Sequence, residues 1–201
     1  MIKKAMILAA GFGKRINPLT LKQPKPLLKI GNETLLSNTL KFLEQLGIKQ
    51  AVINVHYLGE QIVDYINRNQ FNLTINIVKE KNKILNTGGG VLNAIQYFSN
   101  EPFLIINPDT IWNSHYLKAL KSMEKSFFEN KKNKCSLLVV NNRNGIETES
   151  ARYSHHWPVD ILNVSTKYPD DLEEFIAINP NLFDLLWSSK DIKVYLMYPE
   201  N

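Results

Sequence analysis

The chain has 201 residues, of which 44% are hydrophobic and 21% charged, a composition that excludes collagen-like and strongly disordered proteins. Its single cysteine, Cys135, excludes an internal disulfide and favours a reducing compartment. The net charge of +5 favours an anionic partner: a phosphorylated small molecule, a nucleic acid or an anionic membrane surface. No apolar run approaches the roughly 18 residues that span a bilayer, so we expect a soluble, cytoplasmic protein with no membrane partner.

Strand-like and helix-like patterns alternate from residue 5 to residue 140. Continuous or alternating apolar residues predict the strands, whereas apolar residues three and four positions apart predict the helices. Gly47 is placed as the C-terminal stop of the first helix. In chain order we expect a strand at 5–10, a helix at 34–48, a strand at 51–55, a helix at 58–68, a strand at 73–78, a helix at 87–98, a strand at 103–107, a helix at 116–128 and a strand at 136–140.

The C-terminal third has weaker patterns. Residues 141–171 are mostly polar and predict no particular element, 173–187 resemble a strand that leads into a short helix, and 193–198 resemble a last strand. The regular alternation before them is typical of an α/β protein. We therefore predict a single domain, residues 1–201, with a three-layer α/β/α architecture around a mostly parallel, Rossmann-like sheet.

Three loops that follow predicted strands or open predicted helices carry the candidate chemistry. In an open α/β sheet the ligand lies beyond the carboxyl ends of the strands, so these loops are where a site is expected. The first loop is GFGKR at 11–15, the second contains three glycines at 88–90, and the third is NPD at 107–109.

The two commonest glycine-loop motifs do not fit the first loop. A dinucleotide-binding fingerprint needs a third glycine three places after Gly13, where the chain has Ile16. A P-loop needs Gly-Lys five and six places after Gly11, where the chain has Ile16 and Asn17. Neither motif therefore explains the two glycines.

The remaining interpretation of the two glycines is a loop that binds a phosphate chain. Gly11 and Gly13 let backbone N–H groups approach phosphate oxygens closely, and Arg15 and Lys25 can clamp the same oxygens from two sides. Prolines restrict the loop, so the cations are held in place. These prolines are Pro18, Pro24 and Pro26.

A longer pattern identifies a family. LAAGFGKRINPLTLKQPKPLLKI, at 8–30, resembles the L-A-A/G-G-x-G-x-R, P-L-T and P-K-P-L signature of the sugar-1-phosphate nucleotidyltransferases. NTGGGVLNA, at 86–94, resembles the second motif of the branch that includes N-acetylmuramate 1-phosphate uridylyltransferase, and NPD at 107–109 resembles the third motif. The resemblance extends to about residue 140, so 1–140 would form the nucleotide-binding core and 141–201 an atypical or shortened acceptor-binding part.

The resemblance implies a sheet of the nucleotide-diphospho-sugar transferase type and a Mg²⁺-dependent activity. The enzyme would transfer a nucleoside monophosphate from a nucleoside triphosphate, UTP favoured, to a sugar 1-phosphate, releasing pyrophosphate and forming a nucleotide sugar, by implication for the cell wall. Because two anions must meet in such a reaction, catalysis consists mostly of positioning and electrostatic stabilisation. The expected partners are the nucleotide and the sugar phosphate, with no nucleic acid.

The resemblance also assigns roles to residues. Arg15 would hold the departing β and γ phosphates, and Lys25 would neutralise the α-phosphate and the sugar phosphate as they meet. Asp109 would coordinate Mg²⁺. The residues that would bind the nucleotide are Leu8, Ala10, Gly11, Gly13, Arg15, Thr87 and Gly88.

The sequence departs from the family pattern at two places. Pro108 replaces the usual small residue, which removes a backbone N–H beside Asp109. Family members supply a second metal-binding aspartate from a later W-x-D-I/V-G-T segment; WPVDILN, from Trp157, resembles it loosely and nominates Asp160. Alternatively, 176–186 resembles the segment that normally precedes that aspartate, and then Asp191 is only a nearby acid.

Other functions stay open. The same fold could bind a nucleotide without turnover, because of Pro108 and the altered C-terminal third, or it could be a guanylyl- or cytidylyltransferase with another phosphorylated acceptor. A nucleic-acid binder is suggested only by charge, since the chain has no recognition-helix pattern or aromatic stacking strand. The oligomeric state cannot be read from the sequence.

Overall fold

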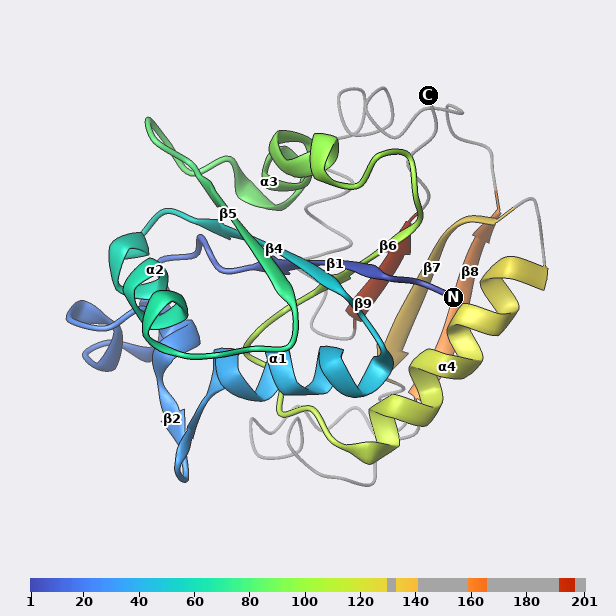
Figure 1. Ribbon diagram of the computed structural model, residues 1–201, viewed down its shortest axis with the longest axis horizontal. Helices are drawn as coiled ribbons and strands as arrows, with labels where there is room; N and C mark the ends of the chain where they lie inside the picture. The colour runs from blue at the N-terminus through green and yellow to red at the C-terminus, as the bar shows by residue number, and fades with distance from the viewer. Residues whose placement is uncertain (130–132, 141–158, 166–191, 198–201) are drawn as a thin grey trace.

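A computed structural model describes residues 1–129, 133–140, 159–165 and 192–197. Its centre is a seven-stranded sheet with the order β5-β4-β1-β6-β9-β7-β8, which runs from one side of the molecule to the other (Figure 1). Within these residues no helix is long and apolar enough to cross a membrane.

The observed elements agree closely with the predicted ones up to residue 140. Each predicted strand and helix in that range is present, with boundaries that differ by a few residues. The strands are β1 (Lys4–Leu8), β2 (Lys29–Ile30), β3 (Glu33–Thr34), β4 (Gln50–Val55), β5 (Thr74–Lys79), β6 (Phe103–Ile106), β7 (Asn133–Val140), β8 (Val159–Ser165) and β9 (Ile192–Met197), and the α-helices are α1 (Leu35–Leu46), α2 (Gly59–Arg68), α3 (Asn86–Ala94) and α4 (Ser114–Glu129).

The sheet is mostly parallel, as predicted. Strands β5, β4, β1 and β6 form parallel pairs, and β7 points the same way because β6 and β7 are both antiparallel to β9 between them. Strand β8 is antiparallel to β7 at the edge. The sequence pattern predicted a strand near β9 but not its place inside the sheet, and it predicted neither β8 nor the short β2–β3 pair.

Local signals explain α1. Thr34 caps its N-terminus by accepting a hydrogen bond from Ser37 N–H at 3.0 Å, and Gly47 ends it in the left-handed conformation at φ 84°. Leu36, Leu40 and Leu43 are fully buried. Because these residues lie on one side of the helix, α1 packs against the sheet through a single apolar stripe.

Side chains of β1 alternate between the two faces of the sheet. Ala5 and Ile7 belong to the core cluster that also contains residues of α1, α2 and α4. Met6 is fully buried but lies outside that cluster, and α3, which contacts β1 and β4, brings the buried Val91 and Ala94 to the sheet. Helices therefore cover both faces, which gives the predicted three layers.

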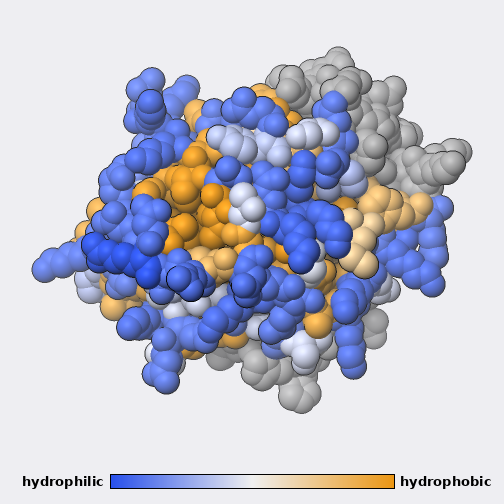
Figure 2. Space-filling view, viewed as in Figure 1, coloured by the Kyte–Doolittle hydropathy of each residue, from blue (hydrophilic) through white to orange (hydrophobic). Residues whose placement is uncertain are grey.

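The outer strand β5 keeps some apolar surface. Figure 2 shows apolar side chains gathered over β5 and the neighbouring α2, and Ile66, Ile75 and Ile77 are partly buried against the core there. Lys79 at the end of β5 is exposed and pairs with Glu60 of α2 at 2.8 Å. A charge of this kind disfavours pairing of the edge strand with another chain.

Candidate functional site

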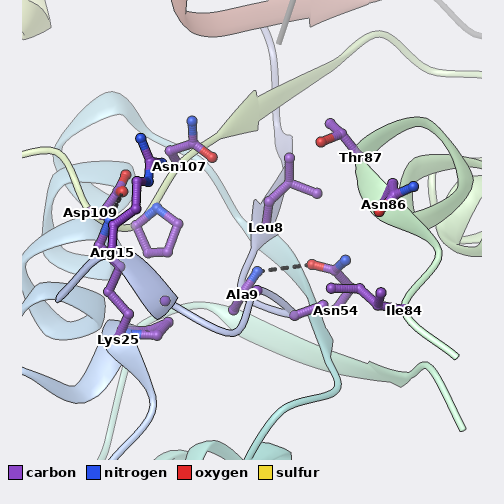
Figure 3. A pocket seen from close by; sticks show the side chains of 15 residues that line it. Leu8, Ala9, Arg15, Lys25, Asn54, Ile84, Asn86, Thr87, Asn107 and Asp109 are labelled. Carbon is purple, nitrogen blue, oxygen red and sulfur yellow. Dashed lines mark hydrogen bonds and ion pairs between the residues drawn. The ribbon is translucent and has the colours of Figure 1, made fainter. Parts of the chain in front are cut away.

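A cavity of about 510 Å³ lies at the carboxyl ends of β1, β4 and β6. The loop after β1, Asn54 of β4, the segment that leads into α3 and the residues after β6 line it. Figure 3 shows Arg15, Lys25 and Asp109 on one side and Asn86 and Thr87 on the other, with Leu8 and Ala9 between them. The three loops singled out in the sequence thus meet at one end of the sheet, as its topology requires.

Most residues predicted for the site line this cavity. Gly88 does not line it: this glycine is buried inside α3, directly after Thr87. The backbone of Asp160 belongs to β8, at the edge of the sheet. The predicted residues that line the cavity are Leu8, Ala10, Gly11, Gly13, Arg15, Lys25, Thr87 and Asp109.

The loop after β1 is held by a tight turn at Gly13. This residue has φ 66°, and a Cβ there would lie 2.9 Å from Thr20 Cγ2 and 3.3 Å from Lys25 Cβ, so only glycine fits. The buried Thr20 places its hydroxyl 3.0 Å from the Gly13 carbonyl. A short 3₁₀ helix, Lys14–Ile16, follows the turn and carries Arg15 to the cavity.

The residues after β4 support the same loop from outside. Tyr57 donates a hydrogen bond from its hydroxyl to the Thr20 carbonyl at 2.9 Å. Phe12 packs its ring against Tyr57 and His56, with centroids 5.4 and 5.8 Å away.

Gly11 is not required by the turn in the way that Gly13 is, because a Cβ on Gly11 would meet nothing within 4 Å. Its missing side chain therefore leaves space on the cavity side rather than avoiding a clash.

Charged groups gather on one side of the cavity, which we call the cationic wall (Arg15, Lys25 and Asp109). Lys25 Nζ forms an ion pair with Asp109 Oδ2, and their side chains are 30% and 35% exposed. None of the described residues forms an ion pair with Arg15, which is exposed. The wall therefore presents one unpaired guanidinium and one half-exposed ion pair to any anion in the cavity.

The segment that carries Asp109 is fixed by α1. Pro108 is buried and its carbonyl accepts a hydrogen bond from Thr39 Oγ1 at 3.3 Å, while Asn38 Oδ1 accepts one from Trp112 N–H at 3.0 Å. Pro108 replaces the small residue usual in the family motif, yet Asp109 still lines the cavity. Pro108 is itself part of the cavity lining, so the proline does not remove its neighbour Asp109 from the cavity.

On the opposite side, none of the described residues that line the cavity is charged, and we call this side the uncharged wall (Asn54, Asn86 and Thr87). Asn54 was missed in the sequence, although a polar residue inside the apolar run AVINV was a usable signal. Glu80, behind this wall, was also missed. Asn54 and Glu80 are 2% and 4% exposed, and Asn54 Nδ2 donates a hydrogen bond to Glu80 Oε1 at 2.7 Å.

The backbone of Asp160 lies three strands away from Asp109. Asp160 pairs with Val139 in the register of β8 and β7, and β9 separates β7 from β6. Three strand spacings correspond to about 14 Å. Asp191, named in the sequence only as a nearby acid, lies outside the described residues. No cluster of three or more His, Cys, Asp or Glu side chains suited to a metal occurs in the part of the chain that the structure describes.

This arrangement suits an elongated, mostly anionic ligand. A phosphate chain can contact the cationic wall and the backbone of the glycine loop, while a neutral ring can lie against the uncharged wall. The size of the cavity is within the range of small-molecule sites.

Curated relatives cover much of the chain. An N-acetylmuramate alpha-1-phosphate uridylyltransferase of Caulobacter vibrioides is 32% identical over 140 residues, which are 68% of this chain and 58% of the relative. A protein of the same name from Neisseria meningitidis serogroup B is 37% identical over 120 residues, 59% of this chain and 52% of the relative. A mannose-1-phosphate guanylyltransferase 1 of Arabidopsis thaliana is 32% identical over 61% of this chain and 35% of its own length. The chain spans a little over half the length of the two uridylyltransferases.

Solved structures share the fold. A UDP-glucose pyrophosphorylase from Acinetobacter baumannii superposes with a TM-score of 0.64 over 98% of this chain and 75% of that chain, at 15% identity. HddC from Yersinia pseudotuberculosis, complexed with GMP-PN, gives 0.59 over 98% of this chain and 77% of that one, at 18% identity. At these identities the likeness establishes the architecture, which is that of the nucleotide-diphospho-sugar transferases.

The family assignment rests on a longer match. Residues 4–145 match the family model described as Nucleotidyl transferase, and this range contains the glycine loop, both cations of the cationic wall, the glycines of α3 and Asp109. The range is more than half of the chain. The chain belongs to the nucleotidyl transferase family.

Proposed function

We propose that this chain transfers a nucleoside monophosphate from a nucleoside triphosphate to a sugar 1-phosphate, with release of pyrophosphate, and that UTP is the preferred donor. The observation that carries the proposal is the meeting of Arg15, Lys25 and Asp109 on one wall of a cavity whose other wall is uncharged. Family membership and two relatives named N-acetylmuramate alpha-1-phosphate uridylyltransferase support it.

The cationic wall can reduce the electrostatic repulsion between the two anionic substrates. Arg15 offers a planar fork of donors for two phosphate oxygens at once, which suits the β and γ phosphates of the donor. Lys25 lies deeper, beside Asp109, and its ammonium can reduce the negative charge where the α-phosphate meets the acceptor phosphate. Backbone N–H groups of the glycine loop add fixed dipoles.

The residues at the cavity also fit Mg²⁺. This ion typically binds one or two carboxylates and takes its other ligands from phosphates and water, and Asp109 supplies a carboxylate at the cavity surface. When bound, Mg²⁺ neutralises phosphate charge and polarises the phosphoryl oxygens. In the proposal, Asp109 holds the metal, and Asp160 stays the predicted second carboxylate.

The choice of nucleobase and sugar is the finer part of the proposal. Relatives include both uridylyl- and guanylyltransferases, so the family alone allows either base. UTP and an N-acetylated sugar 1-phosphate are favoured because NTGGGVLNA, at 86–94, resembles the second motif of the uridylyltransferase branch. A cytoplasmic location follows from such substrates and belongs to the same proposal.

Pyrophosphate release by the purified chain tests the proposal. The panel pairs each of the four ribonucleoside triphosphates and dTTP with the 1-phosphates of N-acetylmuramate, N-acetylglucosamine, glucose and mannose, and with phosphocholine. We expect release with UTP and an N-acetylated sugar 1-phosphate, abolished by EDTA. Release with another pairing would correct the proposed substrates, and no release with any pairing would overturn the proposed enzymatic activity.

One observation favours a second candidate, a nucleotide-binding protein without turnover. Lys25 and Asp109 pair with each other in the structure, so the two groups needed for a phosphate and a metal are mutually occupied. If the pair persists when a nucleotide binds, the chain binds the nucleotide but does not react. Calorimetric binding of a nucleoside triphosphate without pyrophosphate release would identify this candidate.

A further inference from the structure

A chain of three hydrogen bonds runs beneath the cavity from one loop to the other. Ala9 N–H donates to Asn54 Oδ1 at 2.9 Å (Figure 3), Asn54 Nδ2 donates to Glu80 Oε1 at 2.7 Å, and Leu85 N–H donates to Glu80 Oε2 at 2.7 Å. Ala9 leads into the glycine loop, and Leu85 leads into α3. We call the Asn54 and Glu80 side chains, with these hydrogen bonds, the buried bridge.

The bridge is attached to a rigid part of the sheet. Asn54 lies in β4, beside Leu8 of β1 on one side and Val78 of β5 on the other. Glu80 N–H donates to the Val55 carbonyl at 2.9 Å. The bridge therefore has little freedom to move, and its length is fixed by the spacing of two parallel strands.

The ring of His56 adds a contact to the backbone of Glu80. Its Nδ1 lies 2.6 Å from the Glu80 carbonyl oxygen. The same ring packs against Phe12 of the glycine loop, with centroids 5.8 Å apart. The end of β5 is thereby connected to the glycine loop by a second route that does not pass through the bridge.

Helix α3 is fitted to the bridge. A Cβ on Gly90 would lie 2.7 Å from Asn54 Nδ2 and 3.0 Å from Glu80 Oε1, so the helix can lie at this depth only because residue 90 is glycine. Gly90 does not line the cavity. Its role is therefore to let the helix approach the bridge rather than to contact a ligand.

The start of α3 depends on Glu80. No side chain caps this helix locally, and Asn86, its first residue, has φ 58°, a left-handed conformation that asparagine tolerates better than most residues. The Glu80 carboxylate accepts the Leu85 N–H just ahead of that residue, where a negative charge is favourable at a helix N-terminus. Glu80 therefore fixes the turn that places Asn86 and Thr87 at the cavity.

We infer that Asn54 and Glu80 are positioning residues for the nucleotide: the buried bridge sets the separation between the glycine loop and the first turn of α3, and so the width of the slot for the nucleoside. The inference rests on the proposed function, because it assigns the nucleoside to the uncharged wall. The cationic wall lies across the cavity, so the contacts that Arg15 and Lys25 make to the phosphates and to the acceptor do not depend on the bridge.

Exchanging the two polar groups tests the inference. Asn54→Asp places a second buried carboxylate against Glu80, so the hydrogen bond between residues 54 and 80 is lost. In Glu80→Gln the amide NH₂ of residue 80 faces one of its two former donors, Asn54 Nδ2 or Leu85 N–H, so one hydrogen bond is lost there too. The double variant N54D/E80Q retains all three: the residue 54 carboxylate accepts from Ala9 N–H and from the new amide, whose oxygen accepts from Leu85 N–H. Its net charge equals that of the wild type.

We expect each single variant to raise KM for the nucleoside triphosphate about tenfold or more, with the double variant returning close to wild type. KM for the sugar 1-phosphate should change less than about twofold in every variant, because the bridge lies on the other side of the cavity. A lowered Tm with an unchanged nucleotide KM in the single variants would show a merely structural role and overturn the inference.

Two further variants keep the test decisive. Gly90→Ala displaces the bridge without changing charge and should raise the nucleotide KM even if the single variants do not fold; an unchanged KM would contradict the inference. Gln50→Leu is the matched control, since Gln50 bonds Asn76 at 2.9 Å between the same two strands but at their other end. It should lower Tm and leave every KM unchanged. Wild-type protein that neither releases pyrophosphate nor binds a nucleotide would instead overturn the proposed function.

Discussion

The two walls of the cavity are built in different ways. The cationic wall consists of side chains that are exposed or half exposed and that are held by a tight turn, by prolines and by one ion pair. The uncharged wall is supported by Asn54 and Glu80, which are almost fully buried and hydrogen-bonded on both sides. Substitutions in the cationic wall should therefore have little effect on the fold. Substitutions of Asn54 or Glu80, which support the shape of the cavity, should alter the fold more.

The largest expected effect is that of Arg15→Ala on turnover. Removing a cation that stabilises departing phosphates should lower kcat by roughly 10²- to 10³-fold, as for other preorganised electrostatic groups. The Tm should hardly change, because Arg15 is exposed and no described residue forms an ion pair with it. Steady-state pyrophosphate release and a thermal melt measure the two quantities.

Lys14→Ala is the matched control for Arg15→Ala. Lys14 is the neighbouring cation, but it does not line the cavity, and its Nζ lies 5.1 Å from the centroid of the Phe12 ring. Its removal should leave kcat within about twofold of wild type. Equal losses from both variants would mean that only the overall charge of the loop matters.

Asp109→Asn should have the next largest effect. The change removes a carboxylate that can hold Mg²⁺ and also breaks the ion pair with Lys25, so we expect kcat to fall by roughly 10- to 100-fold and the half-maximal Mg²⁺ concentration to rise. Titration of activity with Mg²⁺ measures the shift. Asp160→Asn examines the second predicted ligand: a parallel shift would support Asp160, and an unchanged requirement would remove it from the site.

Gly13→Ala should affect stability more than chemistry. Residue 13 has φ 66° and the added Cβ would lie 2.9 Å from Thr20 Cγ2, so we expect a loss of about 1–3 kcal/mol in the free energy of unfolding. Urea denaturation measures it. An unaltered stability would show that the turn at the base of the cationic wall relaxes freely, which would contradict the described geometry.

Gly11→Ala should have the smallest effect on the fold. A Cβ at residue 11 meets nothing within 4 Å, so stability should change by less than about 0.5 kcal/mol. The methyl group would nevertheless occupy space at the cavity, so KM for the nucleoside triphosphate should rise. The two variants thus distinguish Gly13, which the turn requires, from Gly11, which leaves room for a ligand. An unchanged KM in Gly11→Ala would contradict that role for Gly11.

Short-range signals made much of the molecule predictable. The apolar spacing of α1 and the stop at Gly47 are both local, and the structure contains each of them. The meeting of Lys25 and Asp109 followed from a rule of topology, since loops at the carboxyl ends of neighbouring parallel strands lie together. Arg15, Lys25 and Asp109, which lie in loops after these strands, all line the cavity.

Long-range pairing was not predictable from one sequence. Strand β9 inserts between β6 and β7, and the strand pattern alone does not name a neighbour. Asn54 and Glu80 are 26 positions apart, and their hydrogen bond depends on the register of β4 and β5. Gly88 was assigned to the cavity from its motif, but the helical turn that follows Thr87 carries it into the protein interior.

The affinity ratio between a nucleoside triphosphate and its monophosphate tests the division into two walls most directly. Calorimetry with UTP and UMP, or with the base that the panel identifies, would compare wild type, Arg15→Ala and Asn54→Asp. The account predicts that Arg15→Ala weakens triphosphate binding and spares the monophosphate, whereas Asn54→Asp weakens both by the same factor. Loss of monophosphate binding in Arg15→Ala, with normal binding of both in Asn54→Asp, would contradict it.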